Sequence, residues 1–273
     1  MQKPLKFLAF DTATHRLSVA VTDGTRVWQH ASPGGAQAST TLIPTILKLL
    51  ADSCMALGDM DAIVFGRGPG SFSGLRTACA VAQGLAFGAN HGTGIAVLPV
   101  DTLMAVAEEA RFQQAGALGE ADAAVTITAL LDARMDEMYV QSYEFYSGQC
   151  RLVDVCELIR PENLVPGPHV RLLAGNVFGV YAGRLPAGLA ALPCVDALPT
   201  ATALLRLAPA LLGAGQCVDA AEALPLYVRD KVAQTTDERA RIKADAEADA
   251  EACQTARACE SAFALDTNRC APP

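Results

Sequence analysis

The chain has 273 residues and a formal net charge of −8, and 51% of its residues are hydrophobic while 18% are charged. This apolar content excludes a wholly disordered chain, which needs low hydrophobicity and high charge. The excess of acidic side chains, 29 against 21 basic ones, argues against a protein that holds nucleic acid by itself, because such proteins neutralise phosphates with a basic surface.

No signal peptide is expected, because Lys3 and Lys6 precede only a short apolar run that Asp11 interrupts. No uncharged apolar stretch reaches the roughly 18 residues that a membrane-spanning helix needs. The nine cysteines are scattered among apolar neighbours without a C-x-x-C pair, which favours reduced thiols over a disulfide framework. We therefore expect a soluble cytoplasmic protein with no part in a membrane.

Hydrophobic patterning predicts a β-hairpin at the start of the chain, with a turn that begins at Asp11. A similar strand–turn–strand unit recurs later, where Asp132 opens the turn. This repeat predicts two related α/β halves with a boundary near residues 113–122. In chain order, we expect strands over 5–10, 17–21, 62–65, 94–100, 125–131, 138–145 and 226–228, and helices over 41–57, 74–87, from about 102, and over 200–212.

The first of these helices contains Pro44, which we expect in its first turn, where the missing N–H costs nothing. After about Asp237 the sequence is rich in Ala, Glu, Asp and Arg, with too few large apolar groups for a core. We therefore predict an N-terminal lobe over residues 1–115, a C-terminal lobe over 116–236, and a polar tail over 237–273 that is disordered or a solvated helix.

Residues 65–76, Phe-Gly-Arg-Gly-Pro-Gly-Ser-Phe-Ser-Gly-Leu-Arg, lie between a predicted strand and a predicted helix. Free N–H groups at a helix start can hold an anion, but the segment matches neither the Walker nor the Rossmann spacing. Either the glycines make a tight turn that a serine caps, or the loop accommodates a phosphate. The candidate phosphate-compatible residues are Gly68, Gly70, Ser71, Ser73, Gly74 and Arg76.

The two helices that flank this loop are unusually apolar. The apolar side chains of the first one span an arc of roughly 160°, against the usual stripe of about 100°. Such helices are either deep in the core or covered by another subunit. The candidate partner interface comprises Leu42, Ile46, Leu49 and Leu50 in the first helix and Thr77, Val81, Gly84 and Gly88 in the second.

The sequence predicts no catalytic residue and no metal site. Its four histidines include no pair four residues apart, and G-x-S-x-G is absent. Asp11 and Asp132 could hold a phosphate or a metal-bound water in a two-lobed ATPase, although each also suits a turn. The residues alone indicate an α/β protein with a phosphate-compatible loop and a helical interface.

The Gly-rich segment and the later Ala82-Gln83-Gly84-Leu85-Ala86 closely resemble the signature of the TsaB, or YeaZ, family. The likeness continues in residues 8–14, 131–139 and 225–229, and it covers residues 5 to about 232. This resemblance implies an actin-like ATPase fold, related to ribonuclease H, whose two lobes come from a duplicated mixed sheet with flanking helices. It also implies that the two apolar helices form a dimerisation surface.

The resemblance further implies a non-catalytic scaffold subunit of the tRNA N6-adenosine threonylcarbamoyltransferase complex. That complex modifies the adenosine next to the anticodon in tRNAs that read ANN codons. The expected partners are a TsaD-like catalytic subunit, a TsaE-like ATPase, or a second copy of the chain, with tRNA bound only through the complex. No cofactor of its own is expected, since ATP acts in the complex. The alternatives are a glycoprotease-like metallopeptidase, a small-molecule kinase, or a nucleotide-binding actin-like module.

Overall fold

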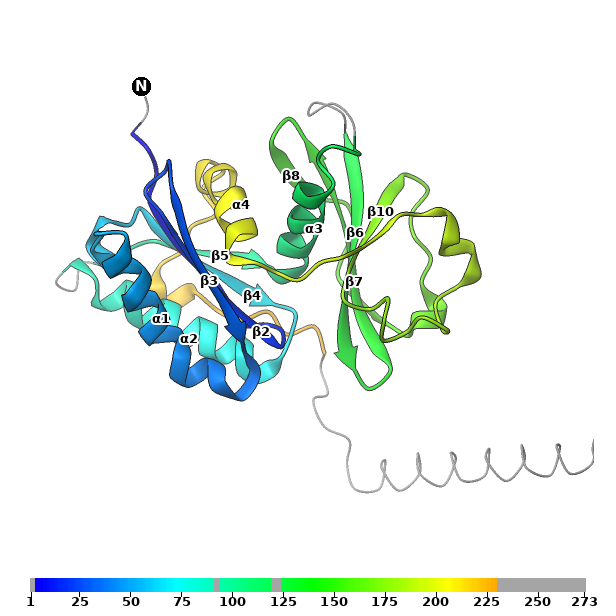
Figure 1. The fold of residues 1–273 in the computed structure, drawn as a ribbon, viewed down its shortest axis with the longest axis horizontal. Coiled ribbons are helices and arrows are strands. Elements are labelled where there is room, and N and C mark those ends of the chain that lie inside the picture. Colours follow the sequence, from blue (N-terminus) through cyan, green and yellow to red (C-terminus); the bar gives the residue numbers. More distant parts are fainter. Residues whose placement is uncertain (1–2, 91–93, 119–123, 230–273) are drawn as a thin grey trace, which may run out of the picture. The chain divides into compact units, whose positions relative to one another are not determined.

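The computed structural model describes residues 3–90, 94–118 and 124–229, which contain two mixed β-sheets (Figure 1). The first sheet has the strand order β3-β2-β1-β4-β5. Strand β1 pairs antiparallel with β2 and parallel with β4, so the predicted N-terminal hairpin is extended by parallel strands. The strands are β1 (Phe7–Asp11), β2 (Arg16–Thr22), β3 (Val27–Pro33), β4 (Ala62–Gly68) and β5 (Val97–Asp101).

The second sheet has the order β11-β10-β6-β7-β8, and β9 also pairs with β7. Strand β6 pairs antiparallel with β7 and parallel with β10, which repeats the pairing of β1 with β2 and β4. This repeated topology confirms the two related α/β halves. The strands are β6 (Val125–Arg134), β7 (Glu137–Tyr146), β8 (Gln149–Leu152), β9 (Glu157–Ile159), β10 (Val170–Gly175) and β11 (Cys194–Asp196).

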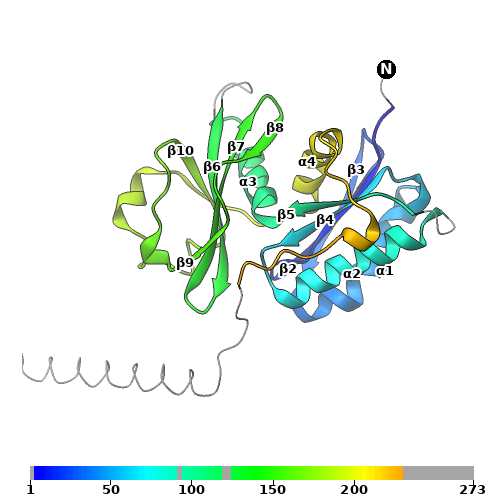
Figure 2. The same cartoon turned by 180° about the vertical axis from the view of Figure 1, so that it is seen from behind.

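Helices cover both faces of the first sheet. Helices α1 (Ala38–Asp52) and α2 (Phe72–Gly88) lie on one face, and α4 (Ala201–Gly213) lies on the other (Figures 1 and 2). Because successive strand side chains point to opposite faces, Leu8 packs in the cluster under α1 and α2, whereas Phe7 packs in the cluster under α4. Burial on both sides explains why β1 and the first half of β4 read as unbroken apolar runs.

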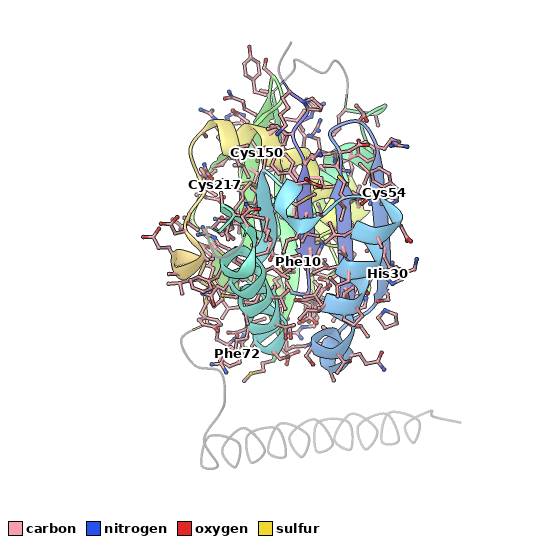
Figure 3. The ribbon with its side chains drawn as sticks, turned by 90° about the vertical axis from the view of Figure 1, so that its left-hand side faces the viewer. Phe10, His30, Cys54, Phe72, Cys150 and Cys217 are labelled. Carbon is pink, nitrogen blue, oxygen red and sulfur yellow. The ribbon has the colours of Figure 1, made fainter. Side chains whose placement is uncertain are left out.

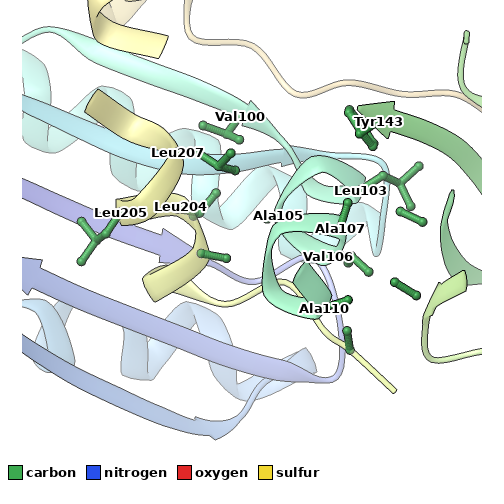
Figure 4. Close-up of a cluster of buried hydrophobic side chains, with 14 of the residues drawn as sticks. Val100, Leu103, Ala105, Val106, Ala107, Ala110, Tyr143, Leu204, Leu205 and Leu207 are labelled. Atoms are coloured by element: carbon green, nitrogen blue, oxygen red, sulfur yellow. The ribbon is translucent and has the colours of Figure 1, made fainter. Parts of the chain in front are cut away.

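Two helices join the halves by packing on the sheet of the other half. Helix α3 (Thr102–Gln113) follows β5 but packs against β6 and β10, whereas α4 follows β11 but packs against β1 and β2. Figure 4 shows Leu103 and Val106 of α3 in one buried cluster with Leu204 and Leu207 of α4. The predicted lobe boundary at residue 115 therefore falls between the sheets, while the core is continuous across it.

The chain then returns to the first sheet through residues 217–228, which we call the C-terminal strap (Figure 2). Val218 forms an antiparallel bridge with Val97 at the edge of the sheet. The carbonyl oxygen of Ala223 accepts hydrogen bonds from Cys79 Sγ at 2.9 Å and Gln83 Nε2 at 3.0 Å. One flank of α2 is thus covered by the strap.

The structure differs from the predicted elements in three ways. Helix α1 begins at Ala38 rather than residue 41 and ends at Asp52, so Pro44 lies inside the helix beyond its first turn. The prediction of a strand over 226–228 is wrong. The Leu226 amide donates one hydrogen bond, to the carbonyl oxygen of Arg67 at 2.7 Å, but the segment is not a strand. Strands β3 and β8–β11 were not predicted, and the expected tail over 237–273 lies outside the described residues.

Among the described helices, none is both long enough and apolar enough to cross a membrane.

Candidate functional site

The Gly-rich segment runs from the end of β4 into the first turn of α2, directly beside the turn that follows β1. The Ser71 amide donates to the carbonyl oxygen of Ala13 at 2.7 Å, and the Thr12 hydroxyl donates to the carbonyl oxygen of Gly74 at 2.8 Å. Two segments that stand far apart in the sequence, the Asp11 turn and the Gly-rich loop, therefore form one structural unit.

The glycines of this loop permit close approach of other backbone segments. A Cβ atom at Gly70 would lie 2.6 Å from the Ala13 carbonyl oxygen, and one at Gly74 would lie 1.9 Å from the Thr12 carbonyl oxygen. At Gly68 the atom would lie 2.5 Å from the carbonyl oxygen of Leu226 in the strap. On the side where a Cβ atom would stand, the space beside these glycines is filled by the chain itself, so close backbone packing accounts for glycine at these positions.

The polar residues of the candidate loop lie at the surface around the start of α2, where the hydroxyl oxygens of Ser71 and Ser73 are 3.4 Å apart. Ser71 and Ser73 are exposed, and Ser71 precedes α2 as its N-cap without a side-chain capping bond. The guanidinium of Arg76 lies 3.7 Å from the ring centre of Phe72, and its Nε donates to the Tyr227 hydroxyl at 3.3 Å. Figure 3 shows Phe72 at one end of α2. Arg76 thus joins the strap to α2.

Asp11 is fully buried at the end of β1. Its Oδ1 accepts a hydrogen bond from the Ala13 amide at 2.8 Å, and its Oδ2 would lie 1.8 Å from a Cβ atom at Gly66. Burial raises the pKa of Asp11 to about 7. The hydrogen bonds from the Ala13 amide and the Thr102 hydroxyl lower this pKa, but their effect is smaller than that of burial. The carboxyl group is therefore enclosed by backbone and half protonated near neutral pH.

Asp132 holds the corresponding place at the second hairpin. Its Oδ1 accepts hydrogen bonds from the Arg134 amide and the Tyr181 hydroxyl, both at 2.8 Å. Asp11 and Asp132 each accept from the amide two residues ahead, which is the geometry of an Asx turn. Within the described ranges, no three His, Cys, Asp or Glu side chains come together in a group that could hold a metal ion. Both aspartates thus stabilise their turns by accepting hydrogen bonds from the backbone.

The candidate partner interface on α1 needs correction. Leu42 and Ile46 are 0% exposed and Leu49 and Leu50 are 6% exposed, because all four pack onto the first sheet. The wide apolar arc of α1 therefore reflects the breadth of its contact with the sheet. The large apolar side chains that α1 leaves open are Ile43, 42% exposed, and Leu47, 58% exposed.

On α2, the four candidate residues are at least partly accessible. Thr77 and Val81 are half-buried, while Gly84 and Gly88 are exposed, with no atom within 4 Å of a Cβ at either glycine. Helices α1 and α2 lie side by side in both views (Figures 1 and 2). We define the α1–α2 face as Ile43, Leu47, Thr77, Val81, Gly84 and Gly88.

Comparison with known proteins places this geometry in a family. A family model described as "TsaD: tRNA N6-adenosine threonylcarbamoyltransferase" matches residues 29–253. TsaB of Escherichia coli is 30% identical over 237 residues, which cover 84% of this chain and 96% of that protein. TsaB of Haemophilus influenzae is 33% identical over 242 residues, covering 84% and 95%. The chain belongs to the TsaB family.

A solved structure of YeaZ from Pseudomonas aeruginosa matches this TsaB chain with a TM-score of 0.71 and 36% identity. The match covers 82% of this chain and 100% of that one. The expected actin-like fold of two lobes is thereby confirmed, as is the family resemblance. Sequence reasoning missed Ile43, Leu47 and the strap, although the strap motif at 225–229 had contributed to the resemblance.

Proposed function

We propose that this TsaB chain is a non-catalytic scaffold subunit in tRNA threonylcarbamoyladenosine biosynthesis, and that it pairs with a TsaD-like catalytic subunit through the α1–α2 face. The observation that carries the proposal is the exposure of Ile43 and Leu47 on α1, together with the open space at Gly84 and Gly88 on the neighbouring α2. The exposed apolar side chains would be buried by a partner, and the glycines would let a partner helix approach α2 closely.

Two features support a scaffold rather than a catalyst. The backbone of the Asp11 turn and of Leu226 fills the space beside the Gly-rich loop, so we assign the ATP-dependent steps to the TsaD-like and TsaE-like partners. The net charge of −8 suits a subunit that meets tRNA only through the complex. We propose that the chain works in the cytoplasm, the compartment that suits a role in tRNA modification.

The same face would serve a second copy of the chain when the catalytic partner is absent. A homodimer and the heterodimer would then compete for Ile43, Leu47 and the glycines of α2. Addition of the TsaD-like subunit should convert the homodimer into the heterodimer, because occupation of one face by one partner excludes the other.

The interface is tested by co-purification with a tagged TsaD-like subunit. Leu47→Glu places a charge on the proposed face, whereas Leu152→Glu places it on β8, where the wild-type side chain is 51% exposed. We expect Leu47→Glu to lose the partner and Leu152→Glu to retain it, with both variants giving the circular dichroism of the wild type. Ile46→Glu would be unsuitable, because that side chain is 0% exposed. Equal recovery of the partner by both variants contradicts the assignment.

The scaffold role is tested by reconstitution. The isolated chain, given ATP, the threonylcarbamoyl precursor and tRNA, should leave the tRNA unmodified, whereas addition of TsaD-like and TsaE-like subunits should restore modification. Peptide cleavage by the isolated chain that is lost on chelation of metal would instead favour the metallopeptidase alternative.

A further inference from the structure

A pocket of about 260 Å³ lies between the C-terminal halves of α3 and α4 and the turn that joins β7 to β8. It is distinct from the α1–α2 face and from the Gly-rich loop. Phe145, Leu207 and Leu211 form its apolar wall, and Cys150, labelled in Figure 3, lies on β8 beside it. Arg111 and Arg206 line its polar part.

The pocket is hollow because the elements around it present small residues. Ala210 lies in the last turn of α4 and Ala214 directly follows the helix, and both line the pocket. The turn opposite consists of Ser147 and Gly148, both with positive φ, at 47° and 74°. These small groups leave open a space that larger side chains at the same positions would fill.

The lining of the pocket holds two guanidinium groups and one carboxylate, and a second carboxylate, that of Glu109, pairs with Arg206 from outside the lining, so the four groups balance in charge. The Glu108 carboxylate, whose side chain is 3% exposed, accepts from Arg111 Nε at 2.7 Å and from Arg206 Nε at 2.7 Å. Arg111 Nη2 also bonds to Glu108, and Arg206 Nη2 bonds to Glu109 at 2.7 Å. Two guanidinium groups therefore line the pocket with one carboxylate, and these ion pairs use the Nε and Nη2 atoms of each arginine.

The Nη1 group of each arginine lies outside those ion pairs, so each guanidinium retains donor capacity. A carboxylate that enters an apolar pocket needs charge-assisted hydrogen bonds to offset the loss of its water. The arginines also belong to different helices, Arg111 to α3 and Arg206 to α4. An anion held by both would connect the two helices that join the halves of the fold.

We propose that this pocket binds a small anionic amphiphile, a carboxylate with a short alkyl or aromatic body. The carboxylate contacts Arg111 and Arg206, and the apolar body lies among Phe145, Leu207 and Leu211. The volume suits roughly ten non-hydrogen atoms, scaled from the benzene that an apolar cavity of about 150 Å³ accommodates. Nothing in the proposed scaffold role requires this site, so the two proposals stand or fall separately.

Isothermal titration calorimetry of the full chain with octanoate and with octan-1-ol tests the proposal. The two probes share a chain length and differ in charge. We expect octanoate to bind about tenfold or more tightly than octan-1-ol. Absence of octanoate binding at millimolar concentration, or equal binding of the two probes, overturns the proposal.

Two variants locate the binding. Ala210→Phe fills the pocket from an exposed helix position and should abolish octanoate binding, whereas Ala51→Phe, at an exposed position of α1, should leave it unchanged. Arg111→Gln should remove the preference for octanoate while octan-1-ol still binds, which also shows that the pocket remains folded. Unchanged octanoate binding in Ala210→Phe, or an unchanged preference in Arg111→Gln, would contradict the site.

Discussion

The Thr12 hydroxyl donates a hydrogen bond of 2.8 Å to the carbonyl oxygen of Gly74, across 62 positions of the chain. The Thr12 carbonyl oxygen, in turn, would lie only 1.9 Å from a Cβ at Gly74. This contact fixes the first turn of α2 against the turn that follows β1. Since α2 supplies four of the six residues of the α1–α2 face, the packing of the Gly-rich loop positions the proposed partner surface.

Gly74→Ala should destabilise the fold by about 1–3 kcal/mol, because the new methyl group meets backbone that cannot move without breaking the Thr12 contact. Urea unfolding followed by circular dichroism measures this. Gly84→Ala is the matched control, since open space surrounds that helical glycine, and it should stabilise the chain by about 0.5–1 kcal/mol. If the two variants are equally stable, the loop is not a close-packed contact.

The buried Asp11 carboxyl predicts that stability falls as the pH rises. Because the folded chain raises the pKa of Asp11 from 3.8 to about 7, the folded state holds a proton that the unfolded state releases between these values. This contribution is fully present below about pH 4 and is lost as the pH rises through 7. Integrated over the shift, it is on the order of 4 kcal/mol.

Asp11→Asn removes the titrating group. Between pH 5 and 8, the free energy of unfolding of this variant should therefore change by roughly 2–4 kcal/mol less than that of the wild type. Urea unfolding of the wild type and of the variant at a series of pH values measures this difference. A wild-type slope in Asp11→Asn would show that Asp11 does not titrate in this way.

The aromatic contact between Phe72 and Tyr227, whose ring centres lie 5.0 Å apart, should hold the strap on α2. Tyr227→Ala removes this contact and the hydrogen bond from Arg76, at an expected cost of about 1–2 kcal/mol. Hydrogen exchange at the Leu226 amide should accelerate as the strap opens. Tyr146→Ala, at a side chain that is 57% exposed, should leave both measurements unchanged, and equal effects of the two variants would exclude a special role for Tyr227.

Periodicity in the sequence located the elements whose burial is one-sided or complete, including the first hairpin, α2 and α4. It missed β3 because that edge strand is mostly exposed, with polar Gln29 and His30 at its centre. It also assigned Leu42 and Ile46 to a partner, because an apolar arc does not reveal whether a sheet or a second protein covers it. Ile43 and Leu47 could be identified as candidate interface residues only from the exposure of their side chains in the folded chain.

The Gly-rich loop illustrates a second limit of the sequence. Its glycines fit equally well with a phosphate cradle and with close packing, and the sequence analysis left both possibilities open. The groups that approach Gly70 and Gly68 belong to Ala13 and Leu226, which lie far away along the chain. Such long-range contacts leave no local pattern, so the close packing of these glycines could be seen only in the tertiary structure.

If the α1–α2 face binds the catalytic subunit as proposed, a charge at Gly84 should lower the affinity of the chain for a purified TsaD-like subunit, and the variant that tests this is Gly84→Glu. Gly84 is exposed with open space around it, so the glutamate should leave the monomer folded while it places a charge in the interface. Gly179→Glu, at another glycine with no atom within 4 Å of its Cβ position, is the control. We predict that Gly84→Glu weakens binding by about a hundredfold, or roughly 2.7 kcal/mol, and that Gly179→Glu binds as the wild type does. Wild-type affinity in Gly84→Glu would contradict the account.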